Sequence, residues 1–218
     1  MNAAHLSCSD CGTRGCSRNQ AERFPAFCPT RNITRELLDE ALACYKRDAE
    51  TATLAREAAL LESDYYCKMT RVEETIEFIK RMGYTKVGVA SCIGLLGEMR
   101  TFSRILDSEG IEHHVVCCKI GATDKSFVGI PDERKLRYKD GQHESMCNPV
   151  MQAKALAEWG AELNILAGLC VGHDAIFIKH AEAPVTVMVV KDRVLGHNPA
   201  AALYSAFSGY SRFPALNK

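Results

Sequence analysis

The chain has 218 residues, 47% of them hydrophobic, which is enough to bury a core in one main domain with a small appendage. Lys and Arg total 27, as do Asp and Glu, so the net charge is near zero and excludes a basic surface for nucleic acid or for an anionic membrane face. No apolar run approaches the roughly 20 residues that cross a bilayer, and the N-terminus lacks a signal-peptide pattern, so we expect a cytoplasmic protein with small-molecule or protein partners.

Residues 1–31 are predicted to form a cysteine-rich metal-binding knot. The segment shows no period of 2 or 3.6 residues, so it cannot build an apolar core unaided. In a cytoplasmic chain its cysteines stay reduced, which favours metal-held thiolates over disulfides. The spacing C-x2-C-x4-C-x11-C, with a proline after the last cysteine, suits a tetrahedral metal ion or an iron–sulfur cluster. We favour a 4Fe-4S cluster, with zinc as the alternative, and the predicted ligands are Cys8, Cys11, Cys16 and Cys28.

Residues 32–82 are predicted to be a helical segment that packs on the core. The run from Thr34 to Leu61 contains no Gly or Pro and reads as helix, with a break near Thr51–Thr53. A second helix is expected over Arg71–Arg81, where apolar residues recur on one face. Cys44 and Cys67 lie in or beside these helices, and we assign both to packing.

Residues 83–218 are predicted to form an α/β domain with a parallel, Rossmann-like sheet and flanking helices. Short apolar runs alternate with amphipathic stretches, and this spacing gives βαβ units. A polar stretch over Lys119–Met146 interrupts the alternation and is expected to be a lid, a binding loop or a mobile segment. The strands are expected at Lys86–Ala90, His113–Cys118, Asn164–Leu169 and Val185–Val190, and the helices at Leu96–Ser108, Pro149–Trp159, His173–His180 and Ala200–Ala206.

A second set of cysteines lies at the ends of the predicted strands. The carboxyl ends of parallel strands line the ligand crevice, so side chains there should converge. Alternation within HHVVCC sends Cys117 and Cys118 to opposite sides, and we choose Cys118. Burial as small hydrophobic residues is the alternative for each cysteine. The predicted cofactor-binding residues are Cys92, Cys118, Cys147 and Cys170.

Several other polar residues come close to this crevice in the predicted fold. Cys147 precedes a helix start, which stabilises a thiolate, and we name it with His173 as the candidate catalytic pair. His173 could instead bind a metal or cap its helix. Lys119 and Lys191 also end strands and could hold an anionic substrate, although an ordinary surface role is the more common one for lysine.

Four stretches of sequence carry a resemblance to a known family: CSDCGTRGC with FCP, GVASCIGL, LNILAGLCVGHD, and VVKDRVLGHNP. On these stretches the chain resembles, over nearly its whole length, proteins with domain of unknown function 1847, which are described as metal-binding. The resemblance implies metal binding through the N-terminal cysteines and implies no particular reaction.

The leading hypothesis is a cysteine-ligated metalloprotein of anaerobic type. An iron–sulfur cluster in the N-terminal knot, with a second one at the strand ends, would suit electron transfer with a redox partner protein or reductive chemistry on a small substrate. One alternative is a structural zinc knot on a non-catalytic binding or metal-handling module. Another is a cysteine-nucleophile enzyme using Cys147 or Cys170 with His173. The sequence permits a homodimer and does not require one, and it leaves open whether the protein is an enzyme.

Overall fold

The computed structural model describes residues 6–136 and 142–213. The chain forms two compact units, the first ending at Leu60 and the second beginning at Leu61. The sequence-based division into residues 1–31, 32–82 and 83–218 stays a prediction.

The first unit consists of short helical turns followed by longer helices. Thr34 caps α2, because its side-chain oxygen accepts a hydrogen bond from Leu37 N. The predicted break near Thr51–Thr53 is wrong: the helix is interrupted at Asp48, whose carboxylate accepts the amide of Glu50 at 3.0 Å and begins a new helix. The elements are η1 (Cys8–Asp10), η2 (Gly15–Arg18), η3 (Ala21–Arg23), α1 (Pro29–Asn32), α2 (Arg35–Arg47) and α3 (Ala49–Tyr65), of which α3 continues into the second unit from Leu61 onward.

Residues 6–60 bury almost nothing. Only Gly15 and Cys28 are buried in this range, and Leu37, Leu42 and Tyr45 of α2 are exposed. Apolar burial is the main favourable contribution to folding, so this unit lacks the usual source of stability. Cys44 and Cys67 are both exposed, which corrects the prediction that they serve packing.

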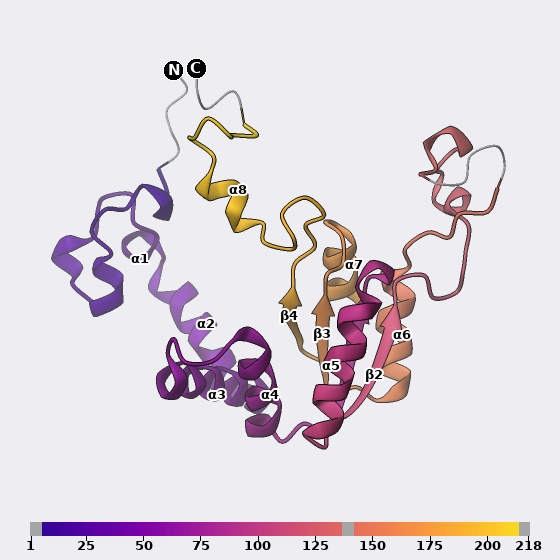
Figure 1. The fold of residues 1–218 in the computed structure, drawn as a ribbon. Coiled ribbons are helices and arrows are strands. Elements are labelled where there is room, and N and C mark those ends of the chain that lie inside the picture. Colours follow the sequence, from indigo (N-terminus) through magenta and orange to yellow (C-terminus); the bar gives the residue numbers. More distant parts are fainter. Residues whose placement is uncertain (1–5, 137–141, 214–218) are drawn as a thin grey trace. The chain divides into compact units, whose positions relative to one another are not determined.

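The second unit is a four-stranded parallel sheet covered by helices on both faces (Figure 1). The short connections include η4 (Ile93–Leu95), η5 (Lys125–Val128) and η6 (Asp132–Arg134). The strands are β1 (Lys86–Ser91), β2 (Glu112–Cys117), β3 (Leu163–Ala167) and β4 (Val185–Val189), and the helices are α4 (Arg71–Met82), α5 (Leu96–Ser108), α6 (Pro149–Trp159), α7 (His173–His180) and α8 (Ala200–Tyr204).

Alternation along the strands divides the core of this unit in two. Val89 points to the face covered by α4 and α5, where it joins a cluster with Ile79 and Phe102. Ala90 points to the opposite face, where it joins a cluster with α6 and α7. The predicted parallel α/β architecture is therefore confirmed, while the comparison with a Rossmann fold stays a prediction.

The strand order β2-β1-β3-β4 places a change of direction at the middle of the sheet. From β1 the chain moves outward to β2, then returns past β1 to β3 and continues to β4. Because right-handed crossovers then put α5 on one face and α6 and α7 on the other, the carboxyl ends of β1 and β3 open a crevice between them. Such a crevice is the expected ligand site of an open parallel sheet.

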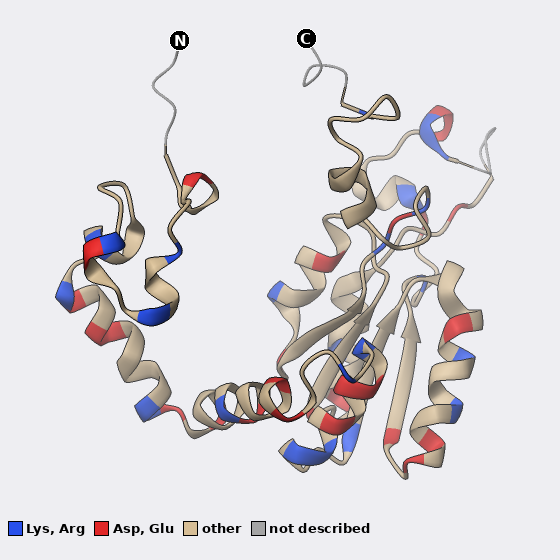
Figure 2. Ribbon diagram, turned by 60° about the vertical axis from the view of Figure 1, so that its left-hand side comes forward, with Lys and Arg blue, Asp and Glu red and all other residues tan. Residues whose placement is uncertain are grey.

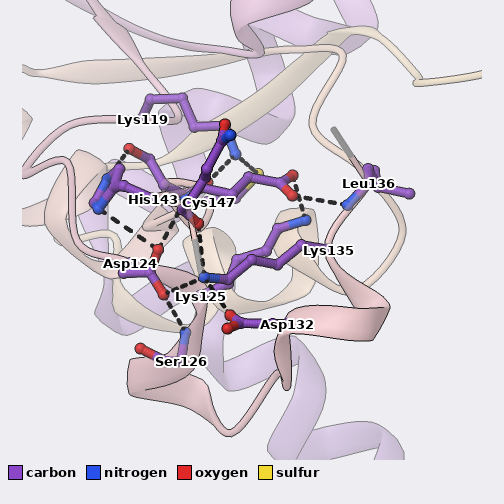
Figure 3. A network of polar contacts seen from close by, with 12 residues as sticks. Lys119, Asp124, Lys125, Ser126, Asp132, Lys135, Leu136, His143 and Cys147 are labelled. Atoms are coloured by element: carbon purple, nitrogen blue, oxygen red, sulfur yellow. Dashed lines mark hydrogen bonds and ion pairs between the residues drawn. The ribbon is translucent and has the colours of Figure 1, made fainter. Parts of the chain in front are cut away.

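The polar stretch after β2 forms a lobe, which we call the polar lobe (residues 121–146, of which 137–141 are not described). Its two ends pair as an antiparallel bridge between Asp124 and Ser145. Lys135 is only 4% exposed and forms ion pairs with Asp124 at 3.1 Å and with Asp132 at 2.8 Å (Figure 3). Ion pairs thus take the place of an apolar core in this segment.

The charged residues of both signs are interspersed along the helices, and the strands carry few of them (Figure 2). This distribution agrees with the net charge near zero. Among the helices of the described residues, none is long and apolar enough to cross a membrane.

Candidate metal and thiol site

Three cysteines from three separate segments meet at the carboxyl ends of β1 and β2. Cys118 N donates to Ser91 O at 2.8 Å, and Asn148 N donates to Cys118 O at 2.8 Å, so backbone hydrogen bonds join the ends of β1 and β2 to the start of α6. The sulfur atoms of Cys118 and Cys147 lie 3.8 Å apart. Cys118 also hydrogen-bonds Cys92, and it is therefore the central member of the group.

The direction of Cys118 follows from strand alternation. Val116 and Cys118 belong to the core cluster formed with α6 and α7. Cys117 instead lines a hollow beside α5, together with Met99 and Val115. Of the two adjacent cysteines, Cys118 is the one that contacts Cys92 and Cys147.

Hydrogen bonds and nearby charges separate the acidities of the three thiols. A hydrogen bond from Cys118, aided by the Gly94 amide and by Lys191, lowers the pKa of Cys92 to about 4. A hydrogen bond from Cys118 and the charges of Lys119 and His173 lower the pKa of Cys147 to about 5. The same contacts raise the pKa of Cys118, because its proton is shared with two thiolates.

Backbone amides also point at this sulfur group. Ile93 N donates to Cys118 Sγ and Gly94 N donates to Cys92 Sγ, each at 3.4 Å. Both amides belong to the turn that follows β1, the start of η4. Amide hydrogen bonds to sulfur stabilise the thiolate form, which is the form that binds metal or attacks an electrophile.

Three cationic side chains surround the sulfur atoms. Lys119 Nζ donates to Ser145 O at 2.6 Å and to Cys147 Sγ at 3.5 Å. Arg193 Nη2 donates to Cys170 Sγ at 2.8 Å, and Lys191 hydrogen-bonds Cys92. Both lysines were expected at strand ends from the sequence, but Arg193 was not, because it lies beyond the end of β4 in a segment without periodicity.

Cys170 lies on the turn between β3 and α7, and His173 is the first residue of α7. Cys170 is half-buried and is held by Arg193 rather than by one of the other three cysteines. His173 Nδ1 is buried and has no hydrogen-bond partner within the described part of the chain. A buried ring nitrogen without a partner is available to a ligand or a proton.

Two residues that support the strand ends could not be predicted from the sequence pattern. Gln152 of α6 is fully buried and donates to Ser91 O at 3.1 Å and to Val116 O at 2.7 Å, tying the ends of β1 and β2 together. Gly168 has φ of +68°, and a side chain there would collide with Leu95. The roles of Gln152 and Gly168 can be recognised only once the pairing of the strands is known.

The two ends of the polar lobe lie next to each other, so Cys147, after the lobe, contacts Cys118, before it. Met146 N donates to Thr123 O at 2.8 Å across the neck of the lobe. Lys119, which precedes the lobe, donates a hydrogen bond to Ser145 O near the end of the lobe, and Figure 3 shows this lysine beside Cys147. The polar stretch, expected to be a lid, a binding loop or a mobile segment, is a lobe whose two described ends are hydrogen-bonded to each other, and Cys147 follows directly after it.

The N-terminal cysteines differ in exposure. Cys8 and Cys16 are exposed, Cys11 is intermediate and Cys28 is buried. Hydrogen bonds from the Thr13 hydroxyl and from the backbone amides of Arg14 and Thr13 lower the pKa of Cys11. In residues 6–136 and 142–213, no group of three or more His, Cys, Asp or Glu side chains is arranged to hold a metal ion. Ligation at both cysteine sets therefore stays a prediction.

These features define a three-layer α/β protein with thiols and cations gathered at the carboxyl edge of its sheet. The family model "Protein of unknown function (DUF1847)" matches residues 28–188. An uncharacterized protein of Methanocaldococcus jannaschii is 40% identical over 202 residues, which are 93% of this chain and 95% of the relative. The chain belongs to the DUF1847 family, which confirms the resemblance seen in the sequence.

Proposed function

We propose that the protein is a cysteine-ligated metalloprotein that binds an iron–sulfur cluster at the strand ends and serves electron transfer or reductive chemistry on a small substrate. The observation that carries the proposal is the meeting of Cys92, Cys118 and Cys147 from three separate segments. Packing alone would not require thiols at all three positions, since other small apolar residues fill such space equally well.

The donor set suits a soft or borderline metal centre. Cys92 and Cys147 ionise readily, so metal binding displaces few protons at neutral pH. Amide hydrogen bonds to sulfur and nearby cations offset the negative charge of a thiolate-ligated cluster and tune its reduction potential. Cys170 and His173 supply candidates for a fourth ligand. A cluster held there would provide an electron-transfer centre or, with one position free, a binding point for substrate.

A second metal site is proposed at Cys8, Cys11, Cys16 and Cys28. Its support is the absence of a hydrophobic core in residues 6–60, where only Gly15 and Cys28 are buried. Metal binding contributes folding free energy directly in small segments of this kind. We favour an iron–sulfur cluster here as well, with structural zinc as the alternative.

The test is metal and sulfide analysis with absorption spectra on protein purified without oxygen. Wild type is compared with Cys11→Ser, Cys118→Ser and Cys44→Ser, the last removing an exposed cysteine that belongs to neither set. We expect iron and sulfide in the wild type, partial loss in each of the first two variants, and no loss in the control. Iron that is absent, or unchanged in Cys118→Ser, would refute a cluster at the strand ends. Zinc lost only in Cys11→Ser would favour the zinc-knot alternative.

A cysteine-nucleophile enzyme is the second candidate, favoured by the low pKa of Cys147 and by the partnerless Nδ1 of nearby His173. The two candidates differ in how iodoacetamide reacts with the protein as purified. A metal-ligated Cys147 is alkylated slowly until a chelator removes the metal. A free nucleophile is alkylated rapidly without chelator, and Cys147→Ser abolishes that rapid phase.

A further inference from the structure

A hollow lies between α5 and β2, on the face of the sheet opposite to the one that Cys118 faces. Its volume is about 370 Å³, which falls within the range of roughly 300–1,000 Å³ that is usual for small-molecule sites. Helix α5 contributes two arginines together with Leu96, Met99 and Ser103, and β2 contributes Val115 and Cys117.

The most buried residues of the hollow are apolar. Met99 is only 3% exposed and belongs to the core cluster beneath α4 and α5, and the half-buried Val115 packs against that cluster. A ligand with an apolar body gains free energy by displacing water from such a surface. The thioether of Met99 also adapts to the shape of a ligand and makes favourable contacts with aromatic rings.

Two arginines border the hollow. Arg100 and Arg104 are exposed and lie one turn apart on α5, so their side chains project from the same face of the helix. Among the described residues, neither side chain has an ion pair or a hydrogen bond. Two like charges at this spacing repel each other modestly. An anion between them would remove the repulsion and accept charge-assisted hydrogen bonds from both.

We propose that this hollow binds a small aromatic carboxylate, with its ring against Met99 and Val115 and its carboxylate held by Arg100 and Arg104. The planar guanidinium group matches the two oxygens of a carboxylate and also stacks on aromatic faces, so the arginines favour both parts of such a ligand. Binding here needs no metal and uses none of the cysteines of the candidate site. It is therefore a property beyond the proposed function.

Cys117 provides a direct measure of occupancy. Its thiol is half-buried and lines the hollow, so a bound ligand shields it from an alkylating reagent. Cys44, which is exposed on α2 in the first unit, is the internal control. Mass spectrometry with fragmentation of the modified peptide distinguishes Cys117 from the adjacent Cys118.

The test compares naphthoate with naphthamide, because the two molecules have nearly the same shape and only the first is charged. Titration calorimetry measures the binding of each to the whole protein. We expect naphthoate to bind about tenfold more tightly than naphthamide, since only the carboxylate accepts charge-assisted hydrogen bonds from the arginines. Saturating naphthoate should slow the alkylation of Cys117 several-fold and leave that of Cys44 unchanged.

Variants separate the contribution of charge from that of shape. Arg100→Gln and Arg104→Gln should each weaken naphthoate binding by about threefold or more and leave naphthamide binding unchanged. Lys154→Gln removes an exposed cation from α6, on the other face of the sheet, and should alter neither. Ser103→Phe fills the hollow while both arginines remain, and it should abolish the binding of both molecules.

Three results would each overturn the proposal: equal affinity for naphthoate and naphthamide, unchanged affinity in both arginine variants, or naphthoate binding that leaves the alkylation of Cys117 unaffected. Circular dichroism and urea unfolding verify that each variant folds. Because Arg100 and Arg104 are exposed, their substitution should not disturb the core, so these two variants decide the matter even if Ser103→Phe does not fold.

Discussion

At the scale of single residues, Cys118 organises the candidate site. It contacts two thiols whose pKa values are about 4 and about 5, while its own pKa is raised. The contacts thus favour the thiolate form at Cys92 and Cys147 and the protonated form at Cys118. Neighbouring thiols would normally oppose each other's ionisation, and here the shared proton, the backbone amides and the cations overcome that repulsion.

The acidity of Cys147 leads to a first prediction. In metal-free protein its alkylation by iodoacetamide should stay nearly constant above roughly pH 6 and fall as the pH drops below about 5, because a lowered pKa keeps the thiolate present into the acid range. Mass spectrometry of the modified peptide measures the rate. Glutathione is the control, since an ordinary thiol reacts faster with rising pH up to about 8.5. A Cys147 profile that follows glutathione would contradict the prediction.

A second prediction concerns Gly168 at the end of β3. Gly168→Ala should lower the free energy of unfolding by about 2–4 kcal/mol, because it combines a left-handed backbone with a collision against Leu95. Gly110→Ala is the matched control: Gly110 has φ of +70° with open space around it, so only the backbone cost of about 1–2 kcal/mol should appear. Urea unfolding measures both, and equal losses would exclude a role for the collision.

At the scale of elements, the sequence predicted most strands and helices of the second unit to within about two residues. Short apolar runs located β1 and β2, and period 3.6 with a closing glycine located α4. The polar lobe could not be predicted in this way. Its order comes from ion pairs between residues distant in sequence, such as Lys125 with Glu144 at 2.6 Å, and no periodicity encodes such pairs.

The residues of the candidate site likewise divide into those that the sequence pattern could predict and those that it could not. Alternation indicated that only one of Cys117 and Cys118 faces the crevice and did not decide which, while Cys92 could be chosen because it follows β1. Arg193 and Gln152 could not be found, since one lies in an irregular segment and the other is a polar residue on the buried face of α6. The sequence also grouped Cys170 with the other three, and only side-chain positions reveal that Arg193 holds it.

The polar lobe gives a third prediction. Asp124→Asn should speed hydrogen exchange at the amides of Lys125, Ser126 and Glu144 at pH 7, because the carboxylate accepts two of these amides directly and pairs with Lys135. Hydrogen bonds from Ser126 and Glu144 hold the pKa of Asp124 well below its usual value. Its contribution is therefore present above about pH 4 and is lost as the pH falls further.

The control for this prediction is Asp132→Asn, which removes the other ion-pair partner of Lys135 from a more exposed position. A smaller effect on the same amides is expected from it. Equal exchange in wild type and Asp124→Asn at pH 7, or a difference that grows toward pH 3, would show that the carboxylate does not order the lobe.

At the scale of the whole molecule, the two units obtain their stability differently. The second has a core on each face of its sheet, while residues 6–60 bury only two residues. The sequence anticipated this for the first 31 residues, because their composition lacks any apolar period. It did not anticipate that α2 would also leave its apolar side chains exposed.

The fourth prediction follows from this difference. Removing metal with a chelator under anaerobic conditions should open residues 6–33 to limited proteolysis, while Leu61–Phe213 resists cleavage as long as its own core persists. Cys16→Ser should be cleaved in the same segment without chelator, and Cys44→Ser should behave as wild type. Cleavage of the N-terminal segment that is independent of metal would refute a metal-ordered knot.

The neck of the polar lobe has a consequence for how this protein can be altered. Because Met146 pairs with Thr123 and Asn148 with Cys118, the positions of Cys118 and Cys147 are set before the chain departs and after it returns. A loop of different length or composition, grafted between Thr123 and Met146, should therefore leave the sulfur atoms of Cys118 and Cys147 in place.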